Sequence, residues 1–227
     1  MFHHKFRATK QYLYNRVANT AAGRALLNHV FKWRYGSSAG YWERRYRHHG
    51  TSGTGSYGEL AVYKASVINR FVMEHGITSV IEFGCGDGNQ LKLFRFPLYT
   101  GLDVSATAVD KCIDIFKDDA TKQFHLYQAG KWNDGPADLS MSLDVIYHLL
   151  EDMIFEKYMH DLFAAAKSYV IIYSWEREEI QLQHIRYRKF NQWIQENIPG
   201  WYLYETIPNR QPVPACDFFI YKRREIE

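Results

Sequence analysis

The stretch Val80-Ile81-Glu82-Phe83-Gly84-Cys85-Gly86-Asp87-Gly88-Asn89-Gln90-Leu91 decides the fold that the sequence predicts. Its first part, residues 80–83, is apolar and β-branched apart from one glutamate, which is typical of a buried strand. The strand is expected to end in three glycines at alternating positions, and residues compatible with a helix follow. Glycines at such a junction let a ligand approach the backbone closely, because no Cβ atom stands in the way.

A second acidic residue follows at the spacing expected for the end of the next parallel strand. Asp103 lies 21 residues after Glu82, within residues 99–104, which have the pattern of a second strand. At the end of a second parallel strand, a carboxylate would lie where ribose hydroxyl groups are bound. The glycine spacing is not the G-x-G-x-x-G of a nicotinamide site, so the glycines alone do not name the ligand.

The combination of Glu82, the G-x-G-x-G run and Asp103 resembles the S-adenosylmethionine site of class I methyltransferases. The resemblance covers about residues 41 to 227. It implies an α/β fold with a seven-stranded, mostly parallel, Rossmann-like sheet flanked by helices, whose last strand is antiparallel. It also implies S-adenosyl-L-methionine as the cofactor and S-adenosyl-L-homocysteine as its product. Another nucleotide ligand on a similar βαβ unit is the alternative.

The resemblance assigns a set of residues to the cofactor. They lie in the glycine-rich junction, at the ends of neighbouring predicted strands and in a loop that looks like a lid: Glu82, Gly84, Cys85, Gly86, Gly88, Asp103, Val104, Gln128, Asp144 and Tyr57. Gln128 is a candidate for an amide contact with adenine, and Trp132 for stacking, although an acidic residue is more usual at that strand end.

Helix and strand patterns alternate along the rest of the chain. They predict a helix over 57–76, a helix capped by Ser105, strands over 124–128, 137–144 and 169–174, a helix from Asp152 whose apolar face reaches Ala166, a helix over 185–198, and strands over 201–207 and 218–222. Residues 51–58 are expected to form a flexible loop that is either a lid or a plain linker. Ser56 and Glu59 have the spacing of a capping box for the helix that follows.

Candidate catalytic residues follow the predicted strand 137–144. Methyl transfer from a sulfonium needs an oriented acceptor and, for a hydroxyl acceptor, a base. His148 is the candidate base, because a neutral imidazole accepts a proton at pH 7. Asp144, four residues earlier, would share a helical face with His148 and orient it, or act as the base itself. The alternative is a histidine that packs and hydrogen-bonds locally, and no metal site is predicted because no diagnostic ligand spacing occurs.

Candidate acceptor-binding residues follow the predicted strand 169–174. Trp175 would be a platform for a sugar ring, and an ordinary half-buried tryptophan is the alternative. His184, Arg186 and Arg188 form a basic cluster that would bind a phosphate or carboxylate of the substrate. On a helix, His184 and Arg188 would share one face, and a solvated charged face is the alternative.

Three segments, residues 142–149, 56–61 and 217–220, resemble bacterial methyltransferase-domain proteins associated with glycan and surface-polysaccharide pathways. This resemblance implies a sugar hydroxyl as the acceptor. A small-molecule O- or N-methyltransferase, an RNA methyltransferase and a non-catalytic scaffold that binds the donor remain alternatives.

The formal net charge of +3 hides an asymmetry. Residues 1–42 contain seven Lys or Arg and no Asp or Glu, whereas the rest of the chain sums to −4, from 21 basic and 25 acidic residues. Residues 1–40 are therefore predicted to be a basic helical arm. Its helix is capped by Thr20 and has Leu26, Leu27, Val30 and Phe31 on one face. The arm either packs on the domain 41–227 or lies on an anionic membrane. Nucleic acid is disfavoured as a partner, because basic residues outside the arm do not exceed acidic ones.

Composition favours a cytoplasmic protein, with the inner membrane face as a peripheral location. Cys85, Cys112 and Cys216 are dispersed, as expected of buried cysteines in a reducing compartment. No apolar run approaches the length of a transmembrane helix, and the N-terminus lacks the pattern of a secretory signal. The sequence does not indicate an oligomeric state.

Overall fold

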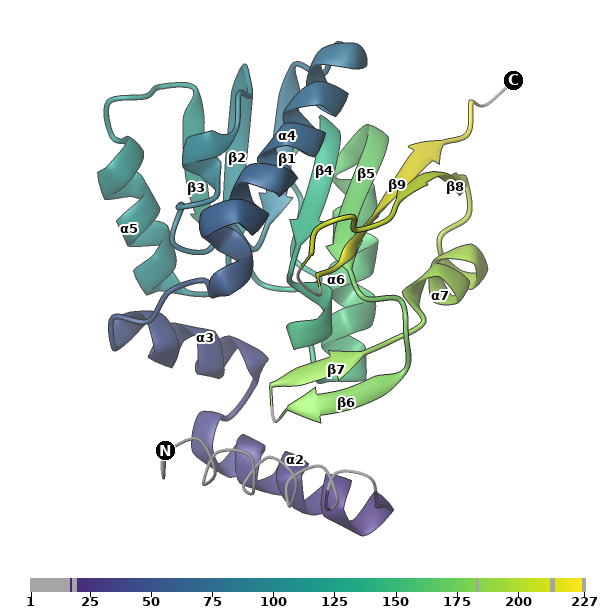
Figure 1. The fold of residues 1–227 in the computed structure, drawn as a ribbon. Helices are drawn as coiled ribbons and strands as arrows, with labels where there is room; N and C mark the ends of the chain where they lie inside the picture. The colour runs from purple at the N-terminus through teal and green to yellow at the C-terminus, as the bar shows by residue number, and fades with distance from the viewer. Residues whose placement is uncertain (1–16, 18–19, 183, 213–214, 226–227) are drawn as a thin grey trace.

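The computed structural model describes residue 17 and residues 20–182, 184–212 and 215–225. Its main feature is a sheet with the strand order β3-β2-β1-β4-β5-β9-β8 (Figure 1). The strands are β1 (Ser79–Phe83), β2 (Leu98–Asp103), β3 (Lys122–Leu126), β4 (Ala137–Leu143), β5 (Ala166–Ser174), β8 (Trp201–Ile207) and β9 (Asp217–Arg223). β1 to β5 are parallel, and β9 is antiparallel to both β5 and β8. The predicted seven-stranded, mostly parallel sheet with an antiparallel last strand is confirmed.

Different helices cover the two faces of the sheet. α4 (Gly58–Glu74) and α5 (Ala106–Phe116) pack on one face, and α6 (Asp152–Ala164) and α7 (Phe190–Asn197) pack on the other. Along β5, Ile171 and Tyr173 belong to the first core and Val170 and Ile172 to the second, because successive side chains point to opposite faces. Burial on both faces explains why central strands are continuous apolar runs.

The connection from β1 to β2 differs from the expectation. The chain forms a short 3₁₀ turn, η2 (Leu91–Leu93), and no α-helix follows the glycines. Phe94 continues with extended backbone, and the rings of Phe94 and Phe96 stack beneath α4 with centroids 4.7 Å apart. Pro97 disfavours helical backbone at the residue before it. The expectation of a helix N-terminus at the glycine-rich junction is therefore wrong.

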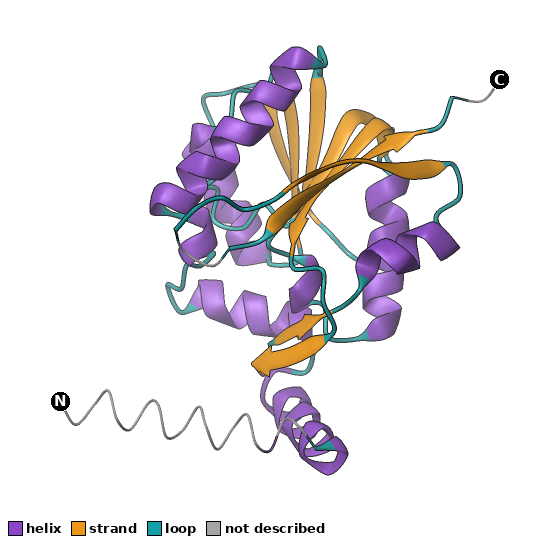
Figure 2. Cartoon of the chain, turned by 45° about the vertical axis from the view of Figure 1, so that its right-hand side comes forward, coloured by secondary structure: helices purple, strands orange, loops and turns teal. Residues whose placement is uncertain are grey.

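The predicted helix over 185–198 is wrong in its first part. β6 (Glu179–Leu182) and β7 (Ile185–Tyr187) form a separate antiparallel hairpin, and α7 begins only at Phe190 (Figure 2). In β7, buried Tyr187 lies between Arg186 and Arg188, which is the alternation of a strand. The helical face predicted for His184 and Arg188 does not exist. Ala166, predicted on the face of α6, belongs to β5.

In the described part of the chain, two helices precede the α/β fold. α2 (Ala21–Tyr35) is capped by Thr20 as predicted, since the Gly23 amide donates to its hydroxyl at 3.0 Å. Gly36 and Ser37 connect it to α3 (Ser38–Arg47), which the sequence patterns did not predict. The predicted boundary between residues 40 and 41 falls within α3. The basic residues Lys5, Arg7, Lys10 and Arg16 lie outside the described residues.

The predicted helix caps have mixed outcomes. Ser105 caps α5, accepting from the Ala108 amide at 3.1 Å, as predicted. The capping box of Ser56 and Glu59 is wrong, because Tyr57 occupies the N-cap of α4 and no side chain caps that helix. Ser56 instead ends the 3₁₀ turn η1 (Thr54–Ser56).

Because the central strands are buried on both faces of the sheet, a substitution in one of them should destabilise the protein. Leu139→Ala in β4 removes a side chain that is 0% exposed, and we expect a loss of about 2–5 kcal/mol of unfolding free energy. Leu126→Ala in edge strand β3 is the matched control, because that leucine is 63% exposed and its loss should cost under about 1 kcal/mol. Urea denaturation measures both; equal losses would contradict the two-faced core.

Candidate functional site

A pocket opens at the carboxyl ends of β1, β2 and β4, the edge at which parallel α/β sheets bind ligands. Helix α3 crosses this end of the sheet (Figure 1). The residues that line the pocket come from α3, α4 and α6, from the segment between α3 and α4, and from the ends of β1, β2 and β4 and the loops after β1 to β4: Ser38, Ala39, Trp42, Tyr46, Ser52, Ser56, Lys64, Glu82, Gly84, Cys85, Gly86, Gln90, Asp103, Val104, Tyr127, Ala129, Leu143, Asp144, Val145, His148, Leu149, Ile154 and Tyr158.

Glycine backbone forms one wall of the pocket. Gly84 and Gly86 have φ angles of +89° and +58°, which side chains rarely allow. A Cβ atom at Gly84 would lie 2.4 Å from Val145 Cγ2, and one at Gly86 would lie 2.3 Å from Ser52 Oγ. Gly88 does not line the pocket; its Cα lies against α5, where a Cβ would come within 3.0 Å of Cys112 Sγ. The first two glycines therefore shape the pocket, and the third packs a helix.

Asp103 ties the end of β2 to the glycine loop. Its Oδ2 accepts from the Gly86 amide and its Oδ1 from the Ser105 amide, both at 2.9 Å. Burial raises the pKa of this carboxyl to about 6, although the two amide bonds oppose the shift. A carboxylate has about four acceptor positions, so two remain for a ligand. This is the arrangement that a diol-binding carboxylate requires.

Glu82 is the second carboxyl group of the pocket. Its Oε2 accepts from the Tyr99 hydroxyl at 2.5 Å. Burial raises its pKa to about 7, while the Tyr99 hydrogen bond and the nearby Lys64 ammonium oppose the shift. The neighbouring Cys85 thiol stays neutral, because its contact with Cys112 and its burial raise its pKa.

Asp144 is the third carboxyl group, and it is held in an unusual backbone conformation with φ at +61°. Its Oδ2 lies 2.7 Å from the Lys64 ammonium, and its Oδ1 accepts from the Tyr147 hydroxyl at 2.9 Å. It makes no hydrogen bond to His148, so the prediction that Asp144 orients the imidazole is wrong. The left-handed backbone at Asp144 breaks the helical turn on which that prediction depended.

Lys64 is a pocket residue that the sequence analysis missed. It lies on the buried face of α4 with Ala61, Ala65 and Ile68, and it is fully buried. A lysine among apolar residues at helical spacing is the signal that would have singled it out, because a buried lysine requires a partner.

His148 lines the pocket at the end of the turn η3 (Ile146–His148). Its Nδ1 lies 2.8 Å from the carbonyl oxygen of His184. A carbonyl only accepts, so Nδ1 carries the proton and Nε2 has a free lone pair. Burial lowers the pKa of His148 to about 4, so the ring is neutral at pH 7. The ring stacks on His184, with centroids 5.5 Å apart, and meets the edge of Trp42.

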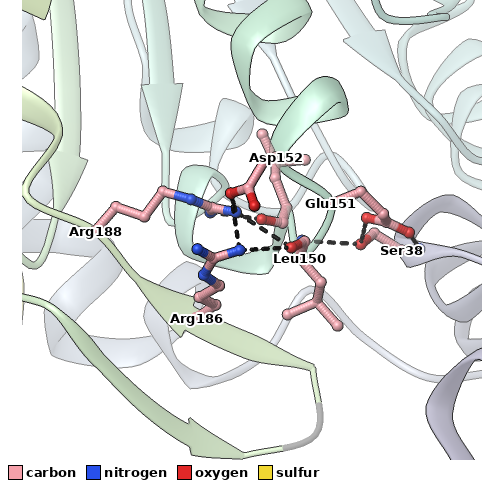
Figure 3. A network of polar contacts seen from close by, with 7 residues as sticks. Ser38, Leu150, Glu151, Asp152, Arg186 and Arg188 are labelled. Carbon is pink, nitrogen blue, oxygen red and sulfur yellow. Dashed lines mark hydrogen bonds and ion pairs between the residues drawn. The ribbon is translucent and has the colours of Figure 1, made fainter. Parts of the chain in front are cut away.

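Helix α3 is fastened over the pocket at its middle and at its start. In the middle, Glu43 accepts from the hydroxyls of Ser105 at 2.6 Å and Thr107 at 2.8 Å, and these bonds hold the pKa of Glu43 at about 2. At the start, the Ser38 amide and hydroxyl both donate to the Glu151 carboxylate (Figure 3). This helix was not predicted from the sequence, although Ser37 has the residue type of an N-cap and accepts from the Gly40 amide.

The loop predicted as a lid lies beside the glycine wall. The Tyr57 hydroxyl donates to Asp87 Oδ2 at 2.6 Å, and the Ser52 amide donates to the same oxygen at 3.1 Å. Tyr57 does not line the pocket, whereas Ser52 and Ser56 do. Tyr57 therefore holds the loop to the glycine turn.

Gln128 also lies outside the pocket. It is exposed and lines a separate surface hollow with Trp132, while its neighbours Tyr127 and Ala129 line the pocket. The end of β3 is thus near the site, as predicted, but the residues that face it are the two on either side of Gln128.

The predicted acceptor-binding residues have partners within the chain. Arg186 and Arg188 donate to the carbonyl oxygens of Leu149 and Leu150 and pair with Asp152 (Figure 3). They hold the hairpin against the loop that carries His148. Trp175 is half-buried beneath Arg177 and near Tyr187, and none of the predicted acceptor-binding residues lines the pocket. His184 reaches the site through His148, because its carbonyl oxygen lies 2.8 Å from His148 Nδ1 and its ring stacks on the His148 ring.

No protein-family model and no curated protein matches the sequence. Solved structures do match the fold. The N-methyltransferase NodS from Bradyrhizobium japonicum WM9, in complex with S-adenosyl-L-homocysteine, has a TM-score of 0.65 and 13% identity, over 83% of this chain and 100% of that one. The magnesium protoporphyrin IX methyltransferase ChlM from Synechocystis PCC 6803, with bound S-adenosyl-L-homocysteine, has a TM-score of 0.60 and 15% identity, over 84% of this chain and 97% of that one.

A third similar structure is the mitomycin 7-O-methyltransferase MmcR, with a TM-score of 0.54 and 13% identity over 73% of this chain and 55% of that one. The names of the three neighbours give them different acceptors, so the fold does not specify one. At these identities the likeness establishes architecture: the chain has the fold of S-adenosylmethionine-dependent methyltransferases.

Proposed function

We propose that the protein transfers a methyl group from S-adenosyl-L-methionine to an acceptor and releases S-adenosyl-L-homocysteine. The observation that carries the proposal is the carboxylate of Asp103, held by the Gly86 amide inside a pocket with a glycine wall. Three carboxyl groups and one ammonium line this pocket, namely Glu82, Asp103, Asp144 and Lys64. Their negative balance suits a ligand that carries a sulfonium and an ammonium cation.

The pocket residues fit the nucleoside part of this donor. The two free acceptor positions of Asp103 suit the ribose hydroxyls. Apolar residues near the ends of β2 and β3 and after β4 would enclose the adenine: Val104, Tyr127, Ala129, Val145, Leu149 and Ile154. A cleft that is mostly apolar, with a few polar groups, is typical of a nucleoside site.

The residues near His148 fit proton removal from a hydroxyl acceptor. When bound, the donor supplies a methyl group on a sulfonium sulfur, which is already activated for in-line transfer. His148 Nε2 would take the proton of the acceptor hydroxyl, and the His184 carbonyl fixes the tautomer that leaves Nε2 free. Asp144 is the less suitable base, because its carboxylate is paired with the Lys64 ammonium.

A sugar hydroxyl, on a glycan or lipid-linked saccharide, is the acceptor we propose. The resemblance of residues 142–149, 56–61 and 217–220 to proteins of glycan pathways supports it. The ring of Trp42, which lines the pocket and contacts His148, is of the kind that packs on sugar faces.

Helix α2 supports a location at the cytoplasmic face of a membrane. Its apolar residues divide between two faces, where the sequence predicted one: Phe31 is buried, whereas Leu26, Val30 and Trp33 are 59%, 37% and 81% exposed. These three recur at i, i+4 and i+7, and Lys32 and Arg34 are exposed beside them. An exposed apolar stripe with basic neighbours suits anionic lipid headgroups. None of the described helices is long and apolar enough to span a bilayer.

Donor affinity is expected to depend on pH. Asp103 and Glu82 have pKa values of about 6 and 7, and a cationic donor favours their ionised forms. Affinity should therefore rise from pH 5 to pH 8, by up to about tenfold per unit for each proton released on binding. Calorimetry with S-adenosyl-L-methionine measures this. Asp103→Asn should weaken binding and flatten the lower part of the profile, whereas Asp138→Asn, at the start of β4, should do neither. A flat wild-type profile would contradict the assignment.

Turnover tests the base. Radiolabelled methyl transfer into fractionated lysate first identifies the acceptor as glycan, lipid, RNA or metabolite. With that acceptor, His148→Ala should lower turnover by about 100-fold or more while donor affinity is retained. His160→Ala is the control, because that histidine is exposed on α6. Undiminished turnover of His148→Ala would remove this residue from the mechanism, and labelling of RNA alone would overturn the sugar acceptor.

Vesicle flotation tests the membrane contact. The wild type should float with vesicles that contain phosphatidylglycerol and not with neutral phosphatidylcholine vesicles. The double variant Leu26→Ser/Trp33→Ser should lose the binding, because it removes the apolar stripe. Met73→Ser is the control, since Met73 is a 75% exposed apolar residue on α4. Binding that survives the double substitution would exclude the stripe as the membrane contact.

A further inference from the structure

The ammonium of Lys64 is a buried cation on the wall of the cofactor pocket. The residue is 0% exposed, and its Nζ lies 2.7 Å from Asp144 Oδ2 and 5.2 Å from the centre of the Tyr173 ring. An ammonium has three N–H donors. In the described part of the chain, Asp144 is its hydrogen-bond acceptor, so the group has donor capacity left over.

Asp144 is arranged to complement this cation. Its carboxylate accepts from Lys64 and Tyr147 and lies 3.5 Å from Cys216 Sγ. The backbone of Gly55 comes so close that a Cβ there would lie 2.6 Å from Asp144 Oδ2. The positive φ of Asp144 is the kind of backbone strain that concentrates at functional sites. The chain thus maintains a buried ion pair at the pocket at some energetic cost.

A third polar side chain, Gln90, lines the same pocket and has one of its two polar atoms unpaired. Gln90 is 5% exposed, and its Nε2 donates to the Ala61 carbonyl at 3.0 Å. Its Oε1 is buried and accepts no hydrogen bond from any described residue. A buried acceptor with no partner costs about 1–3 kcal/mol, so a ligand donor at this position would relieve the cost. Gln90 and Lys64 are connected through α4, which carries both Ala61 and Lys64.

The chemistry of this group of residues matches an α-amino acid. A cation and an anion side by side complement the carboxylate and the ammonium of a zwitterion, and the free amide oxygen of Gln90 accepts a further N–H. The donor of the proposed function has such an amino-acid end, in addition to the nucleoside that Asp103 suits. An isolated buried charge would be far more costly than this exchange of partners.

We propose that Lys64 binds the α-carboxylate of the donor's amino-acid part, while Asp144 and Gln90 accept from its α-ammonium. The proposal rests on the proposed cofactor and adds to it a residue that selects donors with an intact amino-acid end. Lys64 accordingly contributes nothing to the binding of a nucleoside that lacks this end.

Two ligands that differ in the amino-acid part test the proposal. S-adenosyl-L-homocysteine has it, and 5′-methylthioadenosine lacks it. Calorimetry should show that Lys64→Met raises the Kd for S-adenosyl-L-homocysteine at least tenfold and changes the Kd for 5′-methylthioadenosine by less than twofold. Lys167→Met is the matched control, because Lys167 also pairs with an aspartate, Asp138, at the opposite end of the sheet. It should change neither value.

A second variant keeps the test valid if the single substitution leaves Asp144 unpaired and the protein unfolds. Lys64→Met/Asp144→Asn removes both charges, and it should show the same selective loss for S-adenosyl-L-homocysteine. Equal losses for both ligands, or no loss for either, would overturn the role of Lys64. If the wild type binds neither ligand, the proposed cofactor itself is wrong and the inference fails with it.

Discussion

The hydrogen bond from the Gly86 amide to the Asp103 carboxylate joins the two strands on which the pocket depends. It holds the loop after β1 against the end of β2, and the Ser105 amide fixes the other carboxylate oxygen at the start of α5. The Gly84 and Gly86 positions leave no space for a Cβ, so the loop can adopt this conformation only with glycine at both positions. The backbone therefore sets the shape of the pocket, and the side chains that line it supply its charge.

The electrostatics of the pocket follow from its burial. Removing carboxyl groups from water raises the pKa values of Glu82 and Asp103, and the buried ammonium of Lys64, which pairs with Asp144, opposes only part of the shift at Glu82. When a cation binds in such a site, it displaces water or the protons of the carboxyl groups. The opposite shift at His148 has the same cause, since burial disfavours the charged form of an imidazole, and it keeps that ring neutral beside the carboxyl groups.

Helix α3 is held over the pocket by contacts of its side chains with other segments. α3 is bound through Glu43 to the start of α5 and through Ser38 to Glu151, and its Tyr41 ring stacks on His184 of the hairpin at 4.7 Å. The hairpin is bound in turn by Arg186 and Arg188 to the loop that carries His148. α3 and the loop that carries His148 thus line one side of the pocket, and the hairpin packs against both. Because α2 precedes α3 and is joined to it by Gly36 and Ser37 alone, a surface bound by α2 would lie next to this cover.

The sequence by itself determined the sheet, the glycine wall and the carboxyl groups of Glu82 and Asp103, because these depend on local patterns: apolar runs, alternating glycines and an acid at a strand end. Tertiary structure decided the rest. Lys64 lines the pocket because α4 packs against the segment that carries Asp144. α3 covers the pocket because it bonds to Thr107 and Glu151, which lie about 60 and 113 positions away in the sequence. Within the basic cluster His184 to Arg188, residues 185–187 form β7, and the two arginines donate to carbonyl groups of a loop remote in sequence. Side-chain charge is visible in a sequence, but which partner neutralises it depends on contacts that no local spacing encodes.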